Sequence, residues 1–76
     1  MFMPKLPAVT SKELVKALKK MKFYEYHQVG SHLQLKHPDG RRTTIPLHPG
    51  KNIPKGTLKA ILKQINTSHQ ELSEYL

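Results

Sequence analysis

The sequence predicts an α+β fold in which one helix, three antiparallel strands and a second helix follow each other along the chain. Apolar residues recur at helical spacing near both ends of the chain, and between them apolar and polar residues alternate. Two turn signals, Gly30-Ser31 and Pro38-Asp39-Gly40, divide the alternating stretch into three. Both amphipathic helices should pack on one face of the sheet to form a core, leaving the other face for water or a ligand.

The length predicts a single domain spanning residues 1–76. Without cysteine the chain has no disulfide and no cysteine-type zinc site, so the fold must be held by packing. No apolar run approaches the ~20 residues that span a bilayer. Residues 1–10 also lack the pattern of a secretory signal, so we expect a cytoplasmic protein with no membrane partner.

The first helix is predicted to begin after Thr10, because Thr10 and Glu13 have the spacing of a capping box. Its apolar face is made by residues at helical spacing, namely Leu14, Val15, Ala17, Leu18 and Met21. Lysines occupy the other faces, where they either stay solvated or contact an anion.

The first strand should begin near Phe23, where aromatic residues appear and the period changes to two. The alternation places Tyr24 and Tyr26 on the same side as Leu33 and Leu35 of the second strand, which favours a core position over a role in stacking bases. Gly30-Ser31 between these strands suits a type II′ hairpin turn, because glycine tolerates the positive φ at its first position.

The third strand is expected over residues 41–47, with Thr43, Ile45 and Leu47 facing the core. Pro46 cannot donate to a strand ladder, so the strand either ends there or lies at a sheet edge.

After a loop, a second long helix should start at residues 54–57, because apolar residues again recur at helical spacing. Lys55, Lys59 and Lys63 form a basic stripe along it. A second capping-box pattern, Ser68 with Glu71, predicts a short terminal helix that docks through Leu72, Tyr75 and Leu76.

Charge gives the first information about function. Thirteen Lys and Arg stand against five acidic residues, for a formal net charge of +8, and all the basic residues precede Asn66. A field of this sign attracts nucleic acid, an anionic membrane surface or an acidic protein, and charge alone does not choose among them.

Most enzyme classes are excluded by motif. There is no cysteine nucleophile, nucleophile elbow, P-loop or zinc-protease helix, and the interior acids Glu13, Glu25 and Asp39 are too scattered for a two-metal nuclease. The five histidines have no metal-ligand spacing, so we expect neither a metal nor another cofactor. Imidazole can act instead as a general acid or base, and RNA suits that chemistry because its own 2′-hydroxyl is the nucleophile.

The predicted hairpin brings two histidines together. A two-residue turn pairs Val29 with His32 and His27 with Gln34, so His27 and His32 become diagonal neighbours about 7 to 8 Å apart on the face away from the core. Lys36 lies further along the same face. The alternative is that all three are plain surface side chains.

Lysines also lie close together near the start of the second long helix. Lys51 and Lys55 lie near its start, where free amides and the helix dipole favour a phosphate. They either bind the phosphate backbone of a nucleic acid or only keep the surface soluble.

The sequence resembles the HicA toxin family over about residues 11–66. The resemblance is carried by Gly30-Ser31-His32, by Lys36-His37-Pro38, by Pro46 with His48 soon after, and by Pro54-Lys55-Gly56-Thr57-Leu58 leading into Ile61-Leu62-Lys63-Gln64. Residues 67–76 form a short extension outside it. Lys22 stands where members often carry glycine, and His27 where they often carry arginine.

The resemblance implies a fold similar to a double-stranded-RNA-binding domain and the activity of a ribosome-independent mRNA interferase. It makes His32 the catalytic residue, and we expect Gly30, Ser31, Lys36, Lys51 and Lys55 to contact the RNA, with His27 as an auxiliary group. It also implies a HicB-type antitoxin that covers the active site in a hetero-oligomer.

Two other functions fit the same composition. A non-catalytic RNA-binding module would use this fold and charge equally well. A protein-binding domain could offer its basic surface to an acidic partner.

Overall fold

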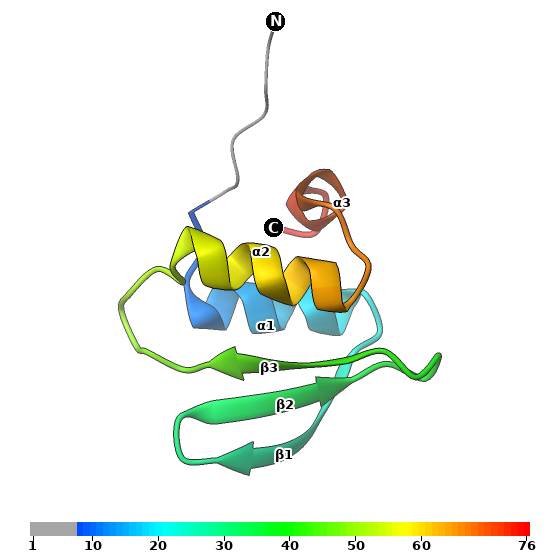
Figure 1. Ribbon diagram of the computed structural model, residues 1–76, viewed down its shortest axis with the longest axis horizontal. Coiled ribbons are helices and arrows are strands. Elements are labelled where there is room, and N and C mark those ends of the chain that lie inside the picture. The colour runs from blue at the N-terminus through cyan, green and yellow to red at the C-terminus, as the bar shows by residue number, and fades with distance from the viewer. Residues whose placement is uncertain (1–7) are drawn as a thin grey trace, which may run out of the picture.

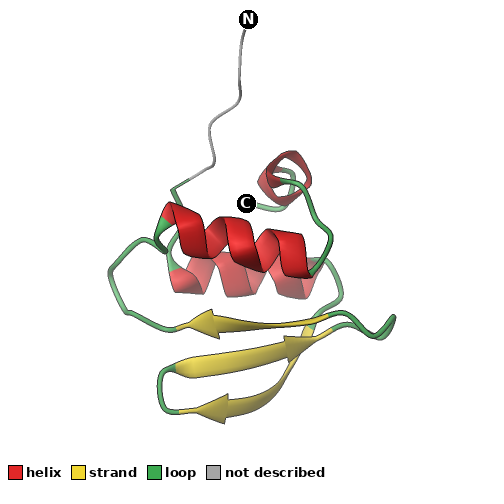
Figure 2. Cartoon of the chain, in the orientation of Figure 1, coloured by secondary structure: helices red, strands yellow, loops and turns green. Residues whose placement is uncertain are grey.

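The computed structural model describes residues 8–76, so most of residues 1–10, which are predicted to lack a secretory signal, lie outside the described residues. Over this range the two long helices cover one face of a three-stranded sheet, and a short third helix lies beyond them (Figures 1 and 2). In chain order the elements are α1 (Ser11–Lys20), β1 (Tyr24–Val29), β2 (His32–Lys36), β3 (Arg42–Pro46), α2 (Lys55–Gln64) and α3 (His69–Ser73). The predicted α+β order is confirmed.

Helix α1 begins as its capping box predicts. The Thr10 hydroxyl accepts a hydrogen bond from the Glu13 amide at 3.2 Å, and the Thr10 amide donates to the Glu13 carboxylate at 2.9 Å. That backbone hydrogen bond favours the ionised carboxylate, so the pKa of Glu13 lies below its ordinary value. The same arrangement recurs at α3, where Ser68 and Glu71 form a second capping box.

Strands β1, β2 and β3 form an antiparallel sheet in sequence order. Val29 pairs with His32 across a two-residue turn, and Gly30 has the positive φ, 56°, that this turn needs at its first position. The hairpin register predicted from the turn is therefore confirmed. Strand β3 is an edge strand that ends at Pro46. Proline has no N–H to donate, and at the end of an edge strand this interrupts no hydrogen bonds between strands.

The core lies between the sheet and the two long helices. Leu35 and Ile45 of the sheet and Leu14, Leu18 and Leu58 of the helices are all fully buried. Over residues 8–76 the buried apolar residues are Val9, Leu14, Ala17, Leu18, Phe23, Leu33, Leu35, Ile45, Ile53, Leu58, Ile61, Leu62, Ile65 and Leu72. The core thus includes Leu72 of α3, which the sequence places in the C-terminal extension.

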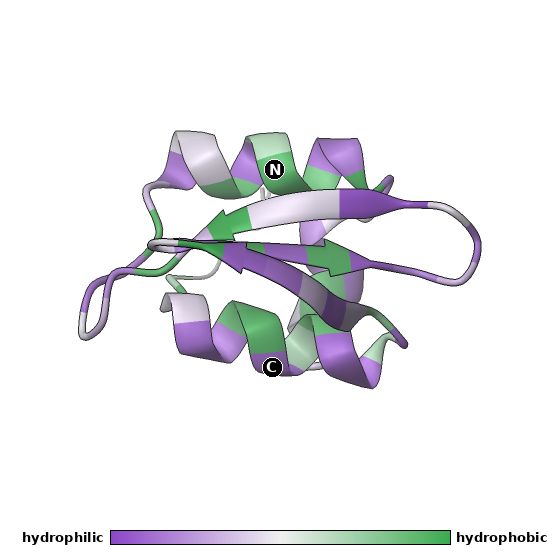
Figure 3. Ribbon diagram, turned by 90° about the horizontal axis from the view of Figure 1, so that it is seen from below, coloured by the Kyte–Doolittle hydropathy of each residue, from purple (hydrophilic) through white to green (hydrophobic). Residues whose placement is uncertain are grey.

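The predicted core position of Tyr24 and Tyr26 is wrong. Their side chains are 47% and 42% exposed, because a β-bulge between Glu25 and His27 inserts Tyr26 as an extra residue and reverses the alternation of β1. Tyr24 therefore pairs with Lys36, which faces away from the core, and Glu25 takes the inward position opposite Leu35. Strand β1 is also the strand farthest from the helices (Figure 1), and the view from below shows it as mostly hydrophilic (Figure 3).

Helix α1 ends with a residue in the left-handed region. Lys22 has a φ of 77°, and the Phe23 amide donates to the Leu18 carbonyl at 3.0 Å in the hydrogen bond that closes a Schellman motif. Helix α2 ends in the same way with Asn66, whose φ is 51°. Glycine, which the resemblance leads us to expect at position 22, adopts this conformation without the steric cost that a lysine has.

Lys22→Gly should therefore stabilise the protein. Relief of the left-handed strain, about 1 to 2 kcal/mol, exceeds the added flexibility of glycine in the unfolded chain, so we expect a net gain of about 0.5 kcal/mol. In thermal unfolding the midpoint should rise by about 2 to 4 °C. Asn66→Gly is the matched control and should change it less, because asparagine tolerates this region. A lower midpoint for Lys22→Gly would contradict the argument.

Candidate active site

The face of the sheet that points away from the helices carries the predicted histidines. We call it the outer face. It is formed by alternate residues of β2, their pairing partners on β1 and β3, and the bulge residue, namely Tyr24, Tyr26, His27, Val29, His32, Gln34, Lys36, Arg42, Thr44 and Pro46. The alternation of β2 supports this assignment, since Leu33 and Leu35 are buried while His32 is exposed.

His32 opens β2 and is held by a neighbour on each side. Val29 is its partner on β1 and Pro46 its partner on β3. His27 pairs with Gln34, so His27 and His32 are the diagonal neighbours that the sequence predicts, about 7 to 8 Å apart at Cα by the geometry of such pairs. Both side chains are exposed, so a substrate can reach them.

The turn before His32 is fixed to the rest of the fold. The Ser31 carbonyl accepts a hydrogen bond from the Leu47 amide at 2.6 Å. The Ser11 hydroxyl donates to the Pro46 carbonyl at 2.6 Å and accepts from the His48 amide at 3.3 Å, which ties the start of α1 to the end of β3. Sequence reasoning missed this role of Ser11. Its only signal was a second hydroxyl residue beside the helix cap.

Lys51 and Lys55 lie at the same end of the molecule as the Gly30-Ser31 turn, in the loop after β3 and at the first residue of α2 (Figure 1). The loop is held by a bridge between Thr10 and Asn52. Both lysine side chains are exposed.

Lys36 shares the outer face with His32 but not its end of the sheet. It closes β2 four residues further on, about 13 Å away along the strand. Its ammonium lies 4.8 Å from the centre of the Tyr26 ring. The structure therefore separates Lys36 from the turn, while it brings Gly30, Ser31, His32 and His27 together.

The carboxylates of the chain are turned elsewhere, so the outer face carries only positive or neutral groups over residues 8–76. Glu25, on the inner side of β1, forms an ion pair with Lys19 of α1. Asp39 contacts Arg41 at 2.8 Å in the turn before β3, and the Arg41 amide that donates to its carboxylate at 3.0 Å holds the pKa of Asp39 below its usual range.

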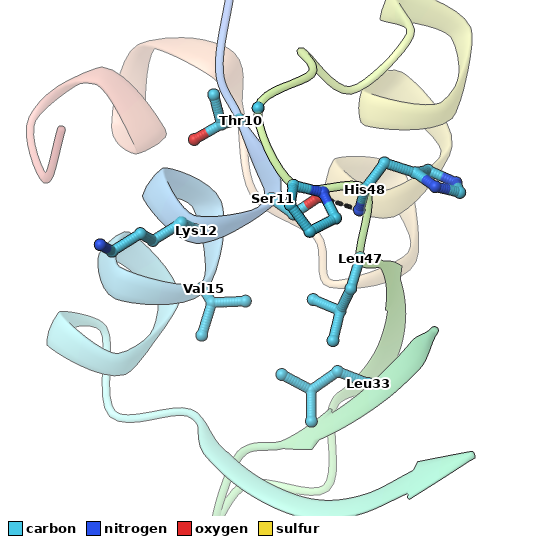
Figure 4. Close-up of a pocket in the computed structure, with 9 residues that line it drawn as sticks. Thr10, Ser11, Lys12, Val15, Leu33, Leu47 and His48 are labelled. Carbon is cyan, nitrogen blue, oxygen red and sulfur yellow. Dashed lines mark hydrogen bonds between the residues drawn. The ribbon is translucent and has the colours of Figure 1, made fainter. Parts of the chain in front are cut away.

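A hollow of about 590 Å³ lies between the start of α1 and the loop after β3. Val15, Leu33 and Leu47 point toward one another in it, while the His48 ring points away (Figure 4). Leu33 and His32 are neighbours on β2 and face opposite sides of the sheet. This hollow is therefore on the core side and is not reached by the His32 imidazole.

Over residues 8–76 no three His, Asp or Glu side chains are grouped so that they could hold a metal ion. None of the helices in the described part of the chain is both long and apolar enough to cross a bilayer.

Comparison with known families agrees with the motifs and the fold. The model of a family described as the HicA toxin of bacterial toxin-antitoxin matches residues 11–67, which include both turns and the two long helices. No curated protein matches the chain. The chain therefore belongs to the HicA toxin family, and is the toxin of a bacterial toxin–antitoxin system with an antitoxin as its partner.

Proposed function

We propose that this toxin is an endoribonuclease that cleaves mRNA independently of the ribosome, with His32 as the general base. The observation that supports this most is the exposed position of His32 at the start of β2, fixed by strand pairing on both sides and flanked by a second exposed histidine. Family membership and a net charge of +8 point to the same substrate.

The chemistry needs only protein groups and the hydroxyl of the substrate. His32 removes the proton of a 2′-hydroxyl, and the resulting oxygen attacks the adjacent phosphorus. The P–O5′ bond breaks, leaving a 2′,3′-cyclic phosphate, and the departing 5′-oxygen takes a proton. We assign His27, the diagonal neighbour of His32, as the auxiliary group that supplies this proton.

The surrounding residues suit a phosphodiester. The exposed Gly30-Ser31 turn offers backbone and hydroxyl donors directly before His32. Lys51 and Lys55 at the same end would bind the phosphates near the cut, since their charge offsets the charge that develops on phosphorus oxygens. Lys36 would bind a phosphate further along the strand.

The antitoxin is proposed to be of the HicB type and to cover His32 in a hetero-oligomer. An acidic partner surface would match the positive outer face and displace RNA by occupying the same charges. With mRNA as the substrate, the site of action is the cytoplasm.

The test is cleavage of a long single-stranded RNA by the purified toxin in excess EDTA, from about pH 5 to 9 around the ordinary pKa of imidazole. Cleavage that persists in EDTA and yields cyclic-phosphate ends supports the proposal. Binding without any cleavage at every pH would instead favour the non-catalytic RNA-binding module, whose fold and charge are the same.

A further inference from the structure

A shallow hollow of about 280 Å³ opens on the outer face, beyond the two histidines. All three strands contribute to it, and it extends past the edge strand β3 to Thr43 and to Gln64 at the end of α2, which lie on the helix side of the sheet. Its lining residues are Tyr26, Gln34, Arg42, Thr43, Thr44 and Gln64. We call it the outer-face hollow.

Tyr26 forms the aromatic wall of the outer-face hollow. As the extra residue of the β-bulge it is 42% exposed. The Lys36 ammonium lies over the ring, 4.8 Å from its centre, so it covers part of one ring face and a base would stack on the opposite face. An exposed aromatic ring next to a cation is the arrangement on which proteins stack a base and hold its phosphate.

The rest of the lining is polar. The half-buried amide of Gln34 and the exposed guanidinium of Arg42 flank the hollow, and Arg42 takes part in no ion pair with residues 8–76. The Thr43 hydroxyl donates to Gln64 Oε1 at 2.7 Å, which leaves the Gln64 amide nitrogen as a donor. Glutamine and arginine side chains are those that read base edges by paired hydrogen bonds.

We propose that the outer-face hollow binds one unpaired base of the RNA substrate, stacked on Tyr26 with its edge on Gln34 and Arg42. The inference rests on the proposed nuclease function and assigns specificity to residues outside the catalytic pair. The occupant is a nucleic acid because the hollow combines an aromatic surface with cations and has no carboxylate in its lining.

The outer-face hollow lies near His32, so the base bound in it can determine where the RNA strand is cleaved. Gln34 is two residues from His32 on the same face, about 7 Å along β2. A base held over Tyr26 therefore lies close to the phosphate that His32 faces, and its identity selects where the strand is cut. The base must be unpaired, because in a duplex its faces are covered by its neighbours.

The experiment measures binding, so that it does not depend on cleavage. In a His32→Ala background, a labelled single-stranded RNA is titrated with protein by fluorescence anisotropy. Tyr26→Ala should weaken binding by about 5- to 150-fold, the range for loss of one stacked base, and Tyr26→Phe should restore it. The same RNA annealed to its complement should bind Tyr26→Ala and its parent equally.

Tyr75→Ala is the matched control, since Tyr75 is 37% exposed in the C-terminal segment after α3. Equal binding of single-stranded RNA by Tyr26→Ala and Tyr75→Ala would overturn the proposal. So would unchanged RNA binding by Tyr26→Ala together with loss of antitoxin binding, which would assign this face to the protein partner. Failure of the nuclease reaction itself would appear separately, as absent cleavage in the protein that retains His32.

A second pair of variants tests whether Arg42 recognises the identity of the bound base. Arg42→Gln and Lys63→Gln remove the same charge from exposed positions, one lining the hollow and one in α2 outside it. Only Arg42→Gln should change the relative affinities for oligonucleotides that differ at one base. Identical base preferences in both variants would overturn the assignment of Arg42.

Discussion

Replacing His32 with alanine should abolish RNA cleavage while leaving the fold and the affinity for RNA nearly unchanged. Removal of a general base costs about 100- to 10,000-fold in rate. The side chain is exposed and makes no core contact, so thermal unfolding should shift little. The measurement is the initial rate of cleavage of a long single-stranded RNA, beside anisotropy of a labelled oligonucleotide as a measure of binding.

Two further histidine variants make this result specific. His27→Ala should lower the rate less than His32→Ala and should change the alkaline limb of the pH profile, because it removes the proposed proton donor. His37→Gln removes an imidazole from the opposite end of the sheet, where it contacts Phe23, and should cleave at the wild-type rate. Full cleavage by His32→Ala would reject its catalytic role.

Replacing Leu72 with alanine should have the second largest effect, on stability. Leu72 is 0% exposed and is part of the core, although it lies beyond the range that matches the family. Large-to-small changes at such sites cost about 2 to 5 kcal/mol. A domain of this size has roughly 4 to 11 kcal/mol of total stability, so the variant should lose a large part of it.

The measurement is urea unfolding followed by circular dichroism. Leu76→Ala is the matched control, because Leu76 is 49% exposed at the end of the same segment and should change the midpoint little. A loss of less than about 1 kcal/mol for Leu72→Ala would mean that α3 is not a structural part of the domain.

The starts of α1 and α3 were predictable because their causes are local. Each capping box joins groups three residues apart, Thr10 with Glu13 and Ser68 with Glu71, so that the side chains satisfy amides that the helix leaves free. The hairpin was predictable for the same reason. A two-residue turn with Gly30 in the left-handed region determines the partner of every residue beside it, including His32.

The candidate site was predicted in part. The positions of His27 and His32 follow from the hairpin alone. The anchoring of the turn does not, since the bonds of Ser11 to Pro46 and His48 span 35 and 37 residues. The residues of the outer-face hollow were likewise not predicted together, because Tyr26, Arg42 and Gln64 belong to three different elements.

The sequence by itself determined the order of the elements, the caps, the register of the hairpin and the face that carries the two histidines. Each of these depends on interactions between near neighbours along the chain. Only the tertiary structure decided that the tyrosines of β1 are exposed and that, of the three apolar residues predicted to dock the terminal helix, Leu72 is buried while Tyr75 and Leu76 are exposed. A single bulge reverses the side to which Tyr24 points, and burial depends on where the helices lie over the sheet, which no local pattern of residues contains.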